Sequence, residues 1–195
     1  MDKYDIIMNA EEQFAREVTL GVIVTRPLTA WHTIIPGFFI VDFLRRGSAI
    51  RQYTKHFMFP RKLAMDAAAA VAVTREKDKE TLNSRIREDI SRWLESLNLY
   101  SLDLVQAHVE LIEQLEAHYL KLLNSDGDTF NFLIEHAYQH RENFKLFIKT
   151  ITLAENEVDR QVIEHLGGEG KVKERVLAEQ QQIAKRRQKI LDEVF

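Results

Sequence analysis

The sequence predicts an all-α protein, and three features of its composition support this fold class. First, glycine and proline are scarce, with 7 and 3 residues among 195, so the chain encodes few turns. Second, strong helix formers such as leucine, alanine, glutamate and lysine predominate. Third, the alternation of apolar and polar residues that is typical of strands is almost absent. We therefore expect an up-and-down bundle of long amphipathic helices, preceded by an N-terminal hydrophobic helical hairpin.

An amphipathic helix is predicted at the N-terminus, over residues 1–26. Ile7, Phe14 and Val18 recur at helical spacing and form one apolar stripe. Pro27 ends this helix, because proline lacks a backbone N–H and disfavours helical geometry in the residue before it. The acidic residues near the N-terminus differ from the positive start of a secretory signal, so export is not expected.

The next segment is strongly hydrophobic. Between residues 28 and 44, Asp42 is the only formally charged side chain. A straight helix of this length would span about 25 Å, which is short of the roughly 30 Å hydrocarbon core of a bilayer. Pro36 and Gly37 interrupt the run at its middle, so we expect the chain to kink or reverse there. The pattern is typical of a hairpin that enters one leaflet from the cytoplasmic side and returns, with basic residues on both flanks.

A basic amphipathic helix is predicted to follow the hairpin, and together they form a unit at residues 27–62. From Arg26 to Lys62 the chain carries seven basic residues against one acid, a net charge of +6 in a protein whose total is −3. Such a helix can lie at a membrane surface, where each cation near anionic headgroups contributes about 1 kcal/mol. The side chains expected to contact a membrane or a partner are Trp31, Ile34, Ile35, Phe38, Phe39, Phe43, Arg45, Arg46, Arg51, Lys55, Phe57 and Phe59.

The hydrophobic segment has two other interpretations, namely a dry internal core or subunit interface and a true membrane span. Burying each large apolar side chain is worth about 1.5–3 kcal/mol in protein or in lipid, so burial energy alone does not choose between them. Asp42 argues against a span, because a carboxylate at that depth costs a few kcal/mol. The clustering of aromatic residues between two basic flanks, without compensating acids, favours contact with one leaflet.

Residues 63–195 are predicted to form the helical bundle. The alanine-rich run at 64–73 is typical of a helix whose small side chains let a neighbour approach closely. Ser101 precedes one later helix, and Asp128 or Thr129 can cap another. Short connections between long helices imply antiparallel neighbours. The four further apolar stripes cover residues 82–97, 101–123, 129–166 and 172–194.

A weaker pattern suggests a metal site inside the bundle. Glu116 lies on the apolar stripe of one predicted helix, and His140 lies on the stripe of the next, with His136 near its edge. If the two helices fold back at residues 124–128, Glu116 comes within one turn of both histidines. A carboxylate opposite two histidines can hold iron, manganese or zinc in a helical bundle. A buried hydrogen bond between histidine and glutamate is the simpler interpretation, so no cofactor is assigned.

Other chemistries find no support in the sequence. The chain has no cysteine, which excludes disulfides, thiolate nucleophiles and cysteine-ligated metals. It also has no glycine-rich phosphate loop, no GxSxG nucleophile elbow and no HExxH motif, so an enzyme is not expected. The basic cluster at residues 185–189 is flanked by acids and is interpreted as a solvated helix face rather than a nucleic-acid site.

These features together predict a non-catalytic peripheral, monotopic membrane scaffold or adaptor at the inner face of the cytoplasmic membrane. Its expected partners are the anionic lipid surface and either another protein or a second copy, with no nucleic acid and no small-molecule substrate. Two alternatives remain open at this stage. One is a helical-bundle metal-binding protein or enzyme that uses the histidine and carboxylate site. The other is a soluble subunit that buries the hydrophobic segment against another protein of a larger complex.

Overall fold

The computed structural model describes residues 2–24, 38–74, 79–167 and 170–195, without the side chains of residues 23–49, 74–79 and 171. The described residues form seven helices and no strand, which confirms the predicted all-α class. The helices are α1 (Lys3–Val24), α2 (Phe38–Thr74), α3 (Lys79–Ser96), α4 (Leu102–Leu123), α5 (Phe130–Tyr138), α6 (Arg141–His165) and α7 (Lys171–Val194).

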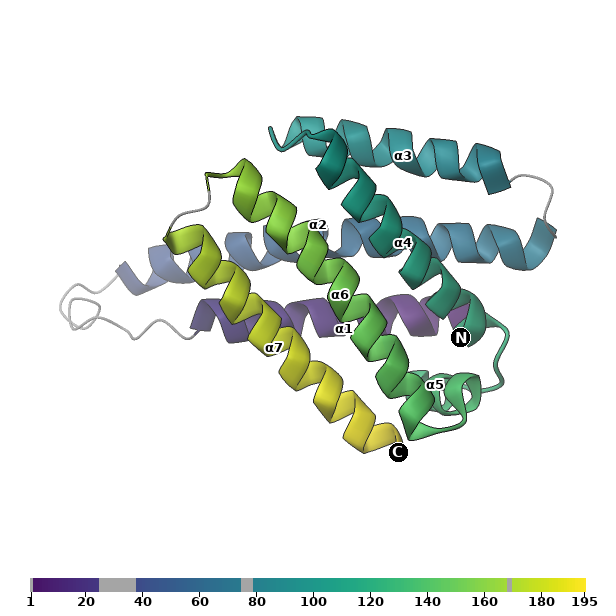
Figure 1. Cartoon of the computed structure of the whole chain (residues 1–195). Helices are drawn as coiled ribbons and strands as arrows, with labels where there is room; N and C mark the ends of the chain where they lie inside the picture. Colours follow the sequence, from purple (N-terminus) through teal and green to yellow (C-terminus); the bar gives the residue numbers. More distant parts are fainter. Residues whose placement is uncertain (1, 25–37, 75–78, 168–169) are drawn as a thin grey trace.

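The helices form two layers that cross each other (Figure 1). Helices α1, α2 and α3 run side by side in one layer, and α4, α6 and α7 lie across them in the other. Between the layers, α2 packs on α4 and α1 packs on α7. The short α5 joins the end of α4 to the start of α6. The described part of the N-terminal region is therefore an integral part of the bundle.

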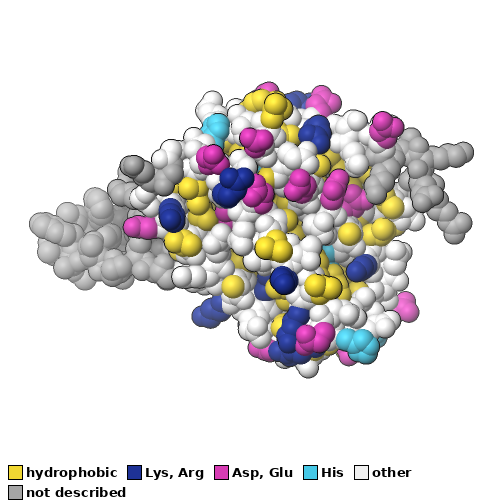
Figure 2. All heavy atoms as spheres, in the orientation of Figure 1, with side chains coloured by type: hydrophobic (Ala, Val, Ile, Leu, Met, Phe, Trp, Pro, Cys, Tyr) yellow, Lys and Arg dark blue, Asp and Glu magenta, His cyan; other side chains and the backbone are white. Residues whose placement is uncertain are grey.

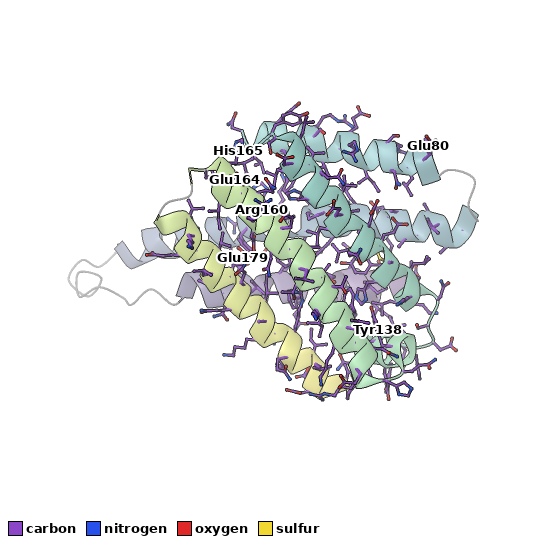
Figure 3. The ribbon with its side chains drawn as sticks, in the orientation of Figure 1. Glu80, Tyr138, Arg160, Glu164, His165 and Glu179 are labelled. Atoms are coloured by element: carbon purple, nitrogen blue, oxygen red, sulfur yellow. The ribbon has the colours of Figure 1, made fainter. Side chains whose placement is uncertain are left out.

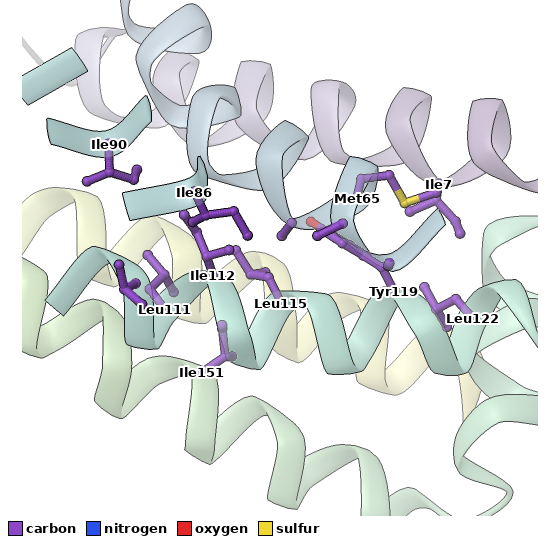
Figure 4. Packing of buried hydrophobic residues seen from close by; sticks show 14 of the residues in the cluster. Ile7, Met65, Ile86, Ile90, Leu111, Ile112, Leu115, Tyr119, Leu122 and Ile151 are labelled. Atoms are coloured by element: carbon purple, nitrogen blue, oxygen red, sulfur yellow. The ribbon is translucent and has the colours of Figure 1, made fainter. Parts of the chain in front are cut away.

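The hydrophobic core lies along α4, which packs against both α2 and α6 (Figure 4). Ile112 and Tyr119 of α4 are fully buried, as are Met65 of α2 and Ile151 of α6. Ala64, Ala67 and Ala68 of the alanine-rich part of α2 are buried as well, and their small side chains allow the close approach to α4 that the sequence suggested. Apolar stripes from helices of both layers thus meet in one continuous core.

Two helix starts follow the capping signals in the sequence. The Ser101 hydroxyl accepts a hydrogen bond from the backbone N–H of Leu104 at 3.1 Å, at the start of α4. The Thr129 hydroxyl accepts one from the N–H of Phe132 at 3.4 Å, at the start of α5. Both side chains satisfy a donor that the first turn of a helix leaves without a partner. The predicted boundaries at these two positions are confirmed.

The prediction of one long helix over residues 129–166 is wrong, because the chain turns at Gln139. This residue has φ = 61°, and the N–H of His140 donates to the carbonyl of Tyr138 at 2.6 Å. A backbone hydrogen bond between residues i and i+2 closes a γ-turn, and a helix cannot continue through this turn. The Tyr138 carbonyl also accepts a hydrogen bond from the Asn143 side chain at 2.9 Å. The helical pattern divides here into α5 and α6.

Helix α2 is longer than the sequence suggested. It is continuous over 37 residues and contains Pro60, so the expected boundary between residues 62 and 63 falls inside it. Its neighbour α1 packs closely against α7 at Gly21. A Cβ atom at this position would lie 2.3 Å from the Gln182 side-chain oxygen, so the flexible end of Gln182 would have to move to accommodate a larger residue.

Candidate functional site

A basic groove of about 760 Å³ lies between α1 and the middle of α2. We define the basic groove by six of its lining residues, which are Glu12, Arg16, Arg51, Lys55, Met58 and Lys62. The three cations of α2 are spaced four and seven residues apart, so they lie on one face of the helix. All three are exposed, and none of them pairs with an acid among the described residues. On α1, Arg16 pairs with Glu12 at 3.4 Å. The groove therefore carries a net positive charge.

The opposite side of the same stretch of α2 faces the bundle. Phe57 stacks on Phe14 of α1 with ring centroids 6.0 Å apart. Phe59 stacks on Trp93 of α3 at 4.7 Å, although it also borders the basic groove. The apolar side of this helix is thus used by the protein's own core, and its basic side is turned outward. A helix that lies with its apolar side on a membrane does not fit this part of α2.

The remaining residues of the predicted contact set lie where the structure gives no side-chain description. Residues 25–37 are outside the described residues altogether, and the first part of α2 is described only as backbone. Membrane or partner contact by this segment stays a prediction. The residues concerned are Trp31, Ile34, Ile35, Phe38, Phe39, Phe43, Arg45 and Arg46.

The other face of the molecule has a different charge pattern. Figure 2 views the layer of α4, α6 and α7, where acidic and basic side chains are interspersed with small hydrophobic patches. On α6, for example, Arg160 pairs with Glu157 at 2.6 Å and with Glu164 at 3.1 Å, and Figure 3 labels two of these three residues. Arg160 is thus balanced by acids on its own helix, unlike the three cations of α2 in the basic groove.

A central ion-pair network of Glu11, Arg61, Glu155 and Arg187 connects α1, α2, α6 and α7. Arg61 donates to Glu11 at 3.1 Å and to Glu155 at 3.0 Å. Arg187 binds both carboxylate oxygens of Glu155, at 2.6 and 2.8 Å. Burial opposes ionisation of Glu155, but Arg187 and Arg61 outweigh it and lower the pKa of this carboxyl below its ordinary value. The network joins four helices through charges that are nearly excluded from water.

Two arginines of this network are corrections to the sequence-based interpretation. Arg61 counted there as part of a basic surface, and Arg187 as part of a solvated helix face. The structure leaves them only 4% and 9% exposed, whereas Lys185 and Lys189 are indeed exposed. The signal that could have revealed the arginines is Glu155 itself, because an acid on an apolar stripe needs a buried cationic partner.

A second, open cavity of about 200 Å³ is lined by residues of α2, α3, α4, α6 and α7. We call it the acidic-aromatic cavity and define it by Tyr53, His56, Trp93, His108, Asp159 and Glu179. Glu179 is labelled in Figure 3. Sequence reasoning missed this cavity, although Asp159 follows Glu155 by four positions and thus shares its helix face.

Burial changes the ionisation of the groups around this cavity. It raises the pKa of Asp159 to about 7, with a further contribution from the nearby carboxylates of Glu179 and Glu155. It also raises the pKa of Glu179 and lowers that of His108. Near neutral pH the imidazoles of the cavity are therefore neutral. Its carboxyl groups Asp159 and Glu179 form no ion pair with a described arginine.

The predicted metal site is not assembled. His136 is exposed, and its Nδ1 forms a hydrogen bond with the backbone carbonyl of Asp126. His140 is exposed at the start of α6, while Glu116 is half-buried on α4. The turn at Gln139 redirects α6, so the predicted register between the two helices does not hold. Within the described ranges, no three His, Asp or Glu side chains converge in a metal-binding arrangement.

His118 is the buried histidine that the sequence reasoning overlooked. Its Nδ1 forms a hydrogen bond with the Tyr138 hydroxyl at 2.8 Å, and its ring stacks on Phe147 at 4.1 Å. Burial lowers the pKa of His118 to about 3, and the charges of Arg187 and Lys121 add to this effect. The imidazole is therefore neutral and acts as a packed, hydrogen-bonded core residue.

Comparisons with protein families, with curated proteins and with solved structures found no match. Among the described helices, none combines the length and apolar character needed to cross a bilayer. The functional argument therefore depends on the geometry and charge of the chain itself.

Proposed function

We propose that this protein is a non-catalytic peripheral membrane scaffold or adaptor that binds the anionic cytoplasmic leaflet. In this proposal the hydrophobic segment at residues 27–46 enters the leaflet, and the basic groove contacts the lipid headgroups. The observation that carries the proposal is the exposed row of Arg51, Lys55 and Lys62 on the helix that continues from this segment.

The energetics support attachment to the membrane through both the basic groove and the hydrophobic segment. Each lysine or arginine close to an anionic surface contributes about 1 kcal/mol, so the three groove cations of α2 supply about 3 kcal/mol. This term alone gives weak, salt-sensitive binding, and stable attachment of a peripheral protein needs a second, hydrophobic contribution. The hydrophobic segment lies next to the cations in the chain and is the natural source of that contribution.

The charge distribution also gives the bound protein an orientation. Residues 26–62 carry a net charge of +6, whereas the chain as a whole carries −3. A negatively charged surface attracts the first part and repels the rest. The layer of α4, α6 and α7 would then face away from the lipid, where it is accessible to another protein or to a second copy.

Co-sedimentation with vesicles tests this proposal. The intact protein is expected to bind vesicles that contain phosphatidylglycerol, to bind pure phosphatidylcholine vesicles far more weakly, and to dissociate as salt is raised. The triple variant Arg51→Gln, Lys55→Gln, Lys62→Gln should lose about 3 kcal/mol, which is roughly 100-fold in affinity.

A matched variant controls for overall charge. Lys149→Gln, Lys173→Gln, Lys185→Gln removes three exposed cations from α6 and α7 and should bind vesicles nearly as well as the intact protein. Equal losses in the two triple variants would show that net charge, rather than the basic groove, governs binding. Binding that is indifferent to anionic lipid would contradict the proposal.

A further inference from the structure

We infer that the acidic-aromatic cavity is a binding site for a small organic ammonium ion. The cavity is lined by helices of both layers and is distinct from the basic groove, with which it shares no lining residue. Its volume of about 200 Å³ is large enough for several water molecules and therefore for an ion of a few heavy atoms.

The first support is an excess of carboxylates around the cavity. Glu155 is already occupied, because both Arg61 and Arg187 bind it. Asp159 accepts a hydrogen bond from the Gln180 amide at 2.8 Å, but neither Asp159 nor Glu179 forms an ion pair with any described residue. Both acids are half-buried and have no ion-pair partner within reach, although Arg61 and Arg175 lie near enough to lower the pKa of Glu179, and a cation that enters the cavity would supply a direct partner.

The second support is the aromatic lining. Trp93 and Tyr53 line the cavity, and aromatic rings attract an ammonium group that approaches within about 6 Å of a ring face. The Trp93 ring lies 5.3 Å from that of His108, and the two meet edge to face. Rings and carboxylates on the walls of one cavity form an environment that favours an organic cation over an anion.

The third support is a pair of neutral imidazoles. His108 donates through Nδ1 to the carbonyl of Leu104 at 2.9 Å, which leaves Nε2 as a hydrogen-bond acceptor. His56 has a buried Nδ1 without a hydrogen-bond partner among the described atoms. Buried polar nitrogens are normally bonded, and this one belongs to a residue that lines the cavity, so it is available for a hydrogen bond with a bound group.

A coordinated metal fits this cavity less well than an organic cation. Zinc, calcium and magnesium need several donor atoms at fixed distances around one point. No such set of three converges in the part of the chain that the structure describes. An ammonium group requires only nearby negative charge and aromatic rings. Both kinds of group line this cavity.

Binding of a cation should be coupled to loss of a proton. Near neutral pH Asp159 is partly protonated, since burial and the neighbouring acids raise its pKa to about 7. A cation favours the ionised form, so the affinity should rise as pH increases, by at most tenfold per pH unit below 7. The groups that face Asp159 and Glu179 from the surrounding helices are Tyr53, His56, Arg61, His108, Glu155, Arg175 and Gln180.

Isothermal titration calorimetry with two cations and their neutral analogues tests the inference. The probes are choline and n-butylammonium, and the analogues are 3,3-dimethyl-1-butanol and 1-butanol, which have similar shapes without the charge. At least one cation should bind with a dissociation constant of about 1 mM or tighter, and its neutral analogue at least about tenfold more weakly. Binding of neither cation would mean that the cavity holds only water, and would overturn the inference.

Variants locate the binding site. Asp159→Asn is expected to weaken binding of the cation by at least about tenfold and to remove its pH dependence between pH 6 and 8. Glu157→Gln, on the same helix but outside the cavity, is the control and should leave binding unchanged. Unchanged binding in Asp159→Asn, with its helical circular dichroism preserved, would also overturn the inference. Equal affinity for a cation and its neutral analogue would also overturn the inference.

Discussion

At the scale of single residues, Glu155 joins two buried arginines in the central ion-pair network. It receives hydrogen bonds from two buried arginines that belong to different helices, Arg61 on α2 and Arg187 on α7. Taking such charges out of water is costly, so the network adds little net stability as a whole. Removing one member of the network is strongly destabilising, because its partners remain charged and buried.

The substitution Glu155→Gln should therefore destabilise the protein by about 3–5 kcal/mol. The glutamine has nearly the same shape but cannot neutralise Arg61 and Arg187. Urea unfolding at pH 7, followed by circular dichroism, measures the free energy of unfolding. Glu157→Gln provides the matched control, since Glu157 pairs only on the outer side of α6. A loss below about 1 kcal/mol for Glu155→Gln would contradict this role.

Asp159 makes the stability of the fold depend on pH. The direction is opposite to that expected of a carboxylate whose pKa is lowered by folding. Its pKa in the folded protein is raised from 3.8 to about 7, so the folded state binds the proton more tightly than the unfolded state. The stabilisation from this proton is fully present below pH 3.8 and is lost as the pH rises to about 7. Glu179, whose pKa is also raised, acts in the same direction.

Relative to Asp159→Asn, the intact protein should thus lose stability between pH 4 and pH 8. A change of about three pKa units corresponds to at most about 4 kcal/mol. Chemical unfolding of both proteins across this pH range gives the difference directly. A difference that is flat with pH, or that grows in favour of the intact protein at high pH, would show that Asp159 is ionised at ordinary pKa in the folded state.

Residue-scale burial was the part that the sequence could predict least. The apolar stripes identify which faces of the helices are buried, because that depends on local periodicity. They do not reveal that Arg61 and Arg187 are buried, since this depends on acids that lie far away in the chain, Glu11 and Glu155. The acidic-aromatic cavity was missed for the same reason, because its walls come from five helices.

At the scale of the helices, the turn between α5 and α6 is the main departure from the predicted pattern. The apolar stripe continues across it, so periodicity alone predicts one helix there. The structure instead places Tyr138 against Phe144 and Phe147, with ring centroids 5.1 and 5.6 Å apart. This aromatic packing stabilises the turn, in which Gln139 has a positive φ.

The substitution Gln139→Gly should increase stability by about 1 kcal/mol, because glycine adopts a positive φ without a steric penalty. Thermal unfolding is the convenient measurement. Gln114→Gly offers a comparison of opposite sign, since this exposed residue lies inside α4, where glycine costs about 1 kcal/mol. If both substitutions destabilise the protein equally, Gln139 is not strained.

The other helices were predicted more closely. The stripes of α1, α3, α4 and α7 have boundaries close to those observed, because each helix begins or ends at a recognisable signal such as Ser101. Helix α2 was divided into a basic helix that ends at residue 62 and an alanine-rich helix, because the composition changes there. The fold keeps them together because both parts pack on neighbouring helices of the bundle.

At the scale of the whole molecule, the described helices share a hydrophobic core. Its buried side chains come from both layers, and the aromatic residues of α2 from Tyr53 to Phe59 pack within it. The basic groove lies on the helix that continues from the hydrophobic segment at residues 27–46, which places the hydrophobic and the cationic elements close together in the chain.

The central claim is that the hydrophobic segment inserts into lipid, and the two tryptophans allow a direct test. Trp31 lies in that segment, whereas Trp93 packs on Phe59 and His108 in the bundle. In the variant Trp93→Phe, all tryptophan fluorescence comes from Trp31. In the variant Trp31→Phe it comes from Trp93, which serves as the internal control.

The decisive measurement is quenching of this fluorescence by anionic vesicles whose acyl chains carry bromine. We expect strong quenching of Trp31 in the Trp93→Phe protein and almost none of Trp93 in the Trp31→Phe protein. If vesicles that pellet with the protein leave the emission of Trp31 unchanged, the segment does not enter the bilayer and the membrane function proposed for this chain is wrong.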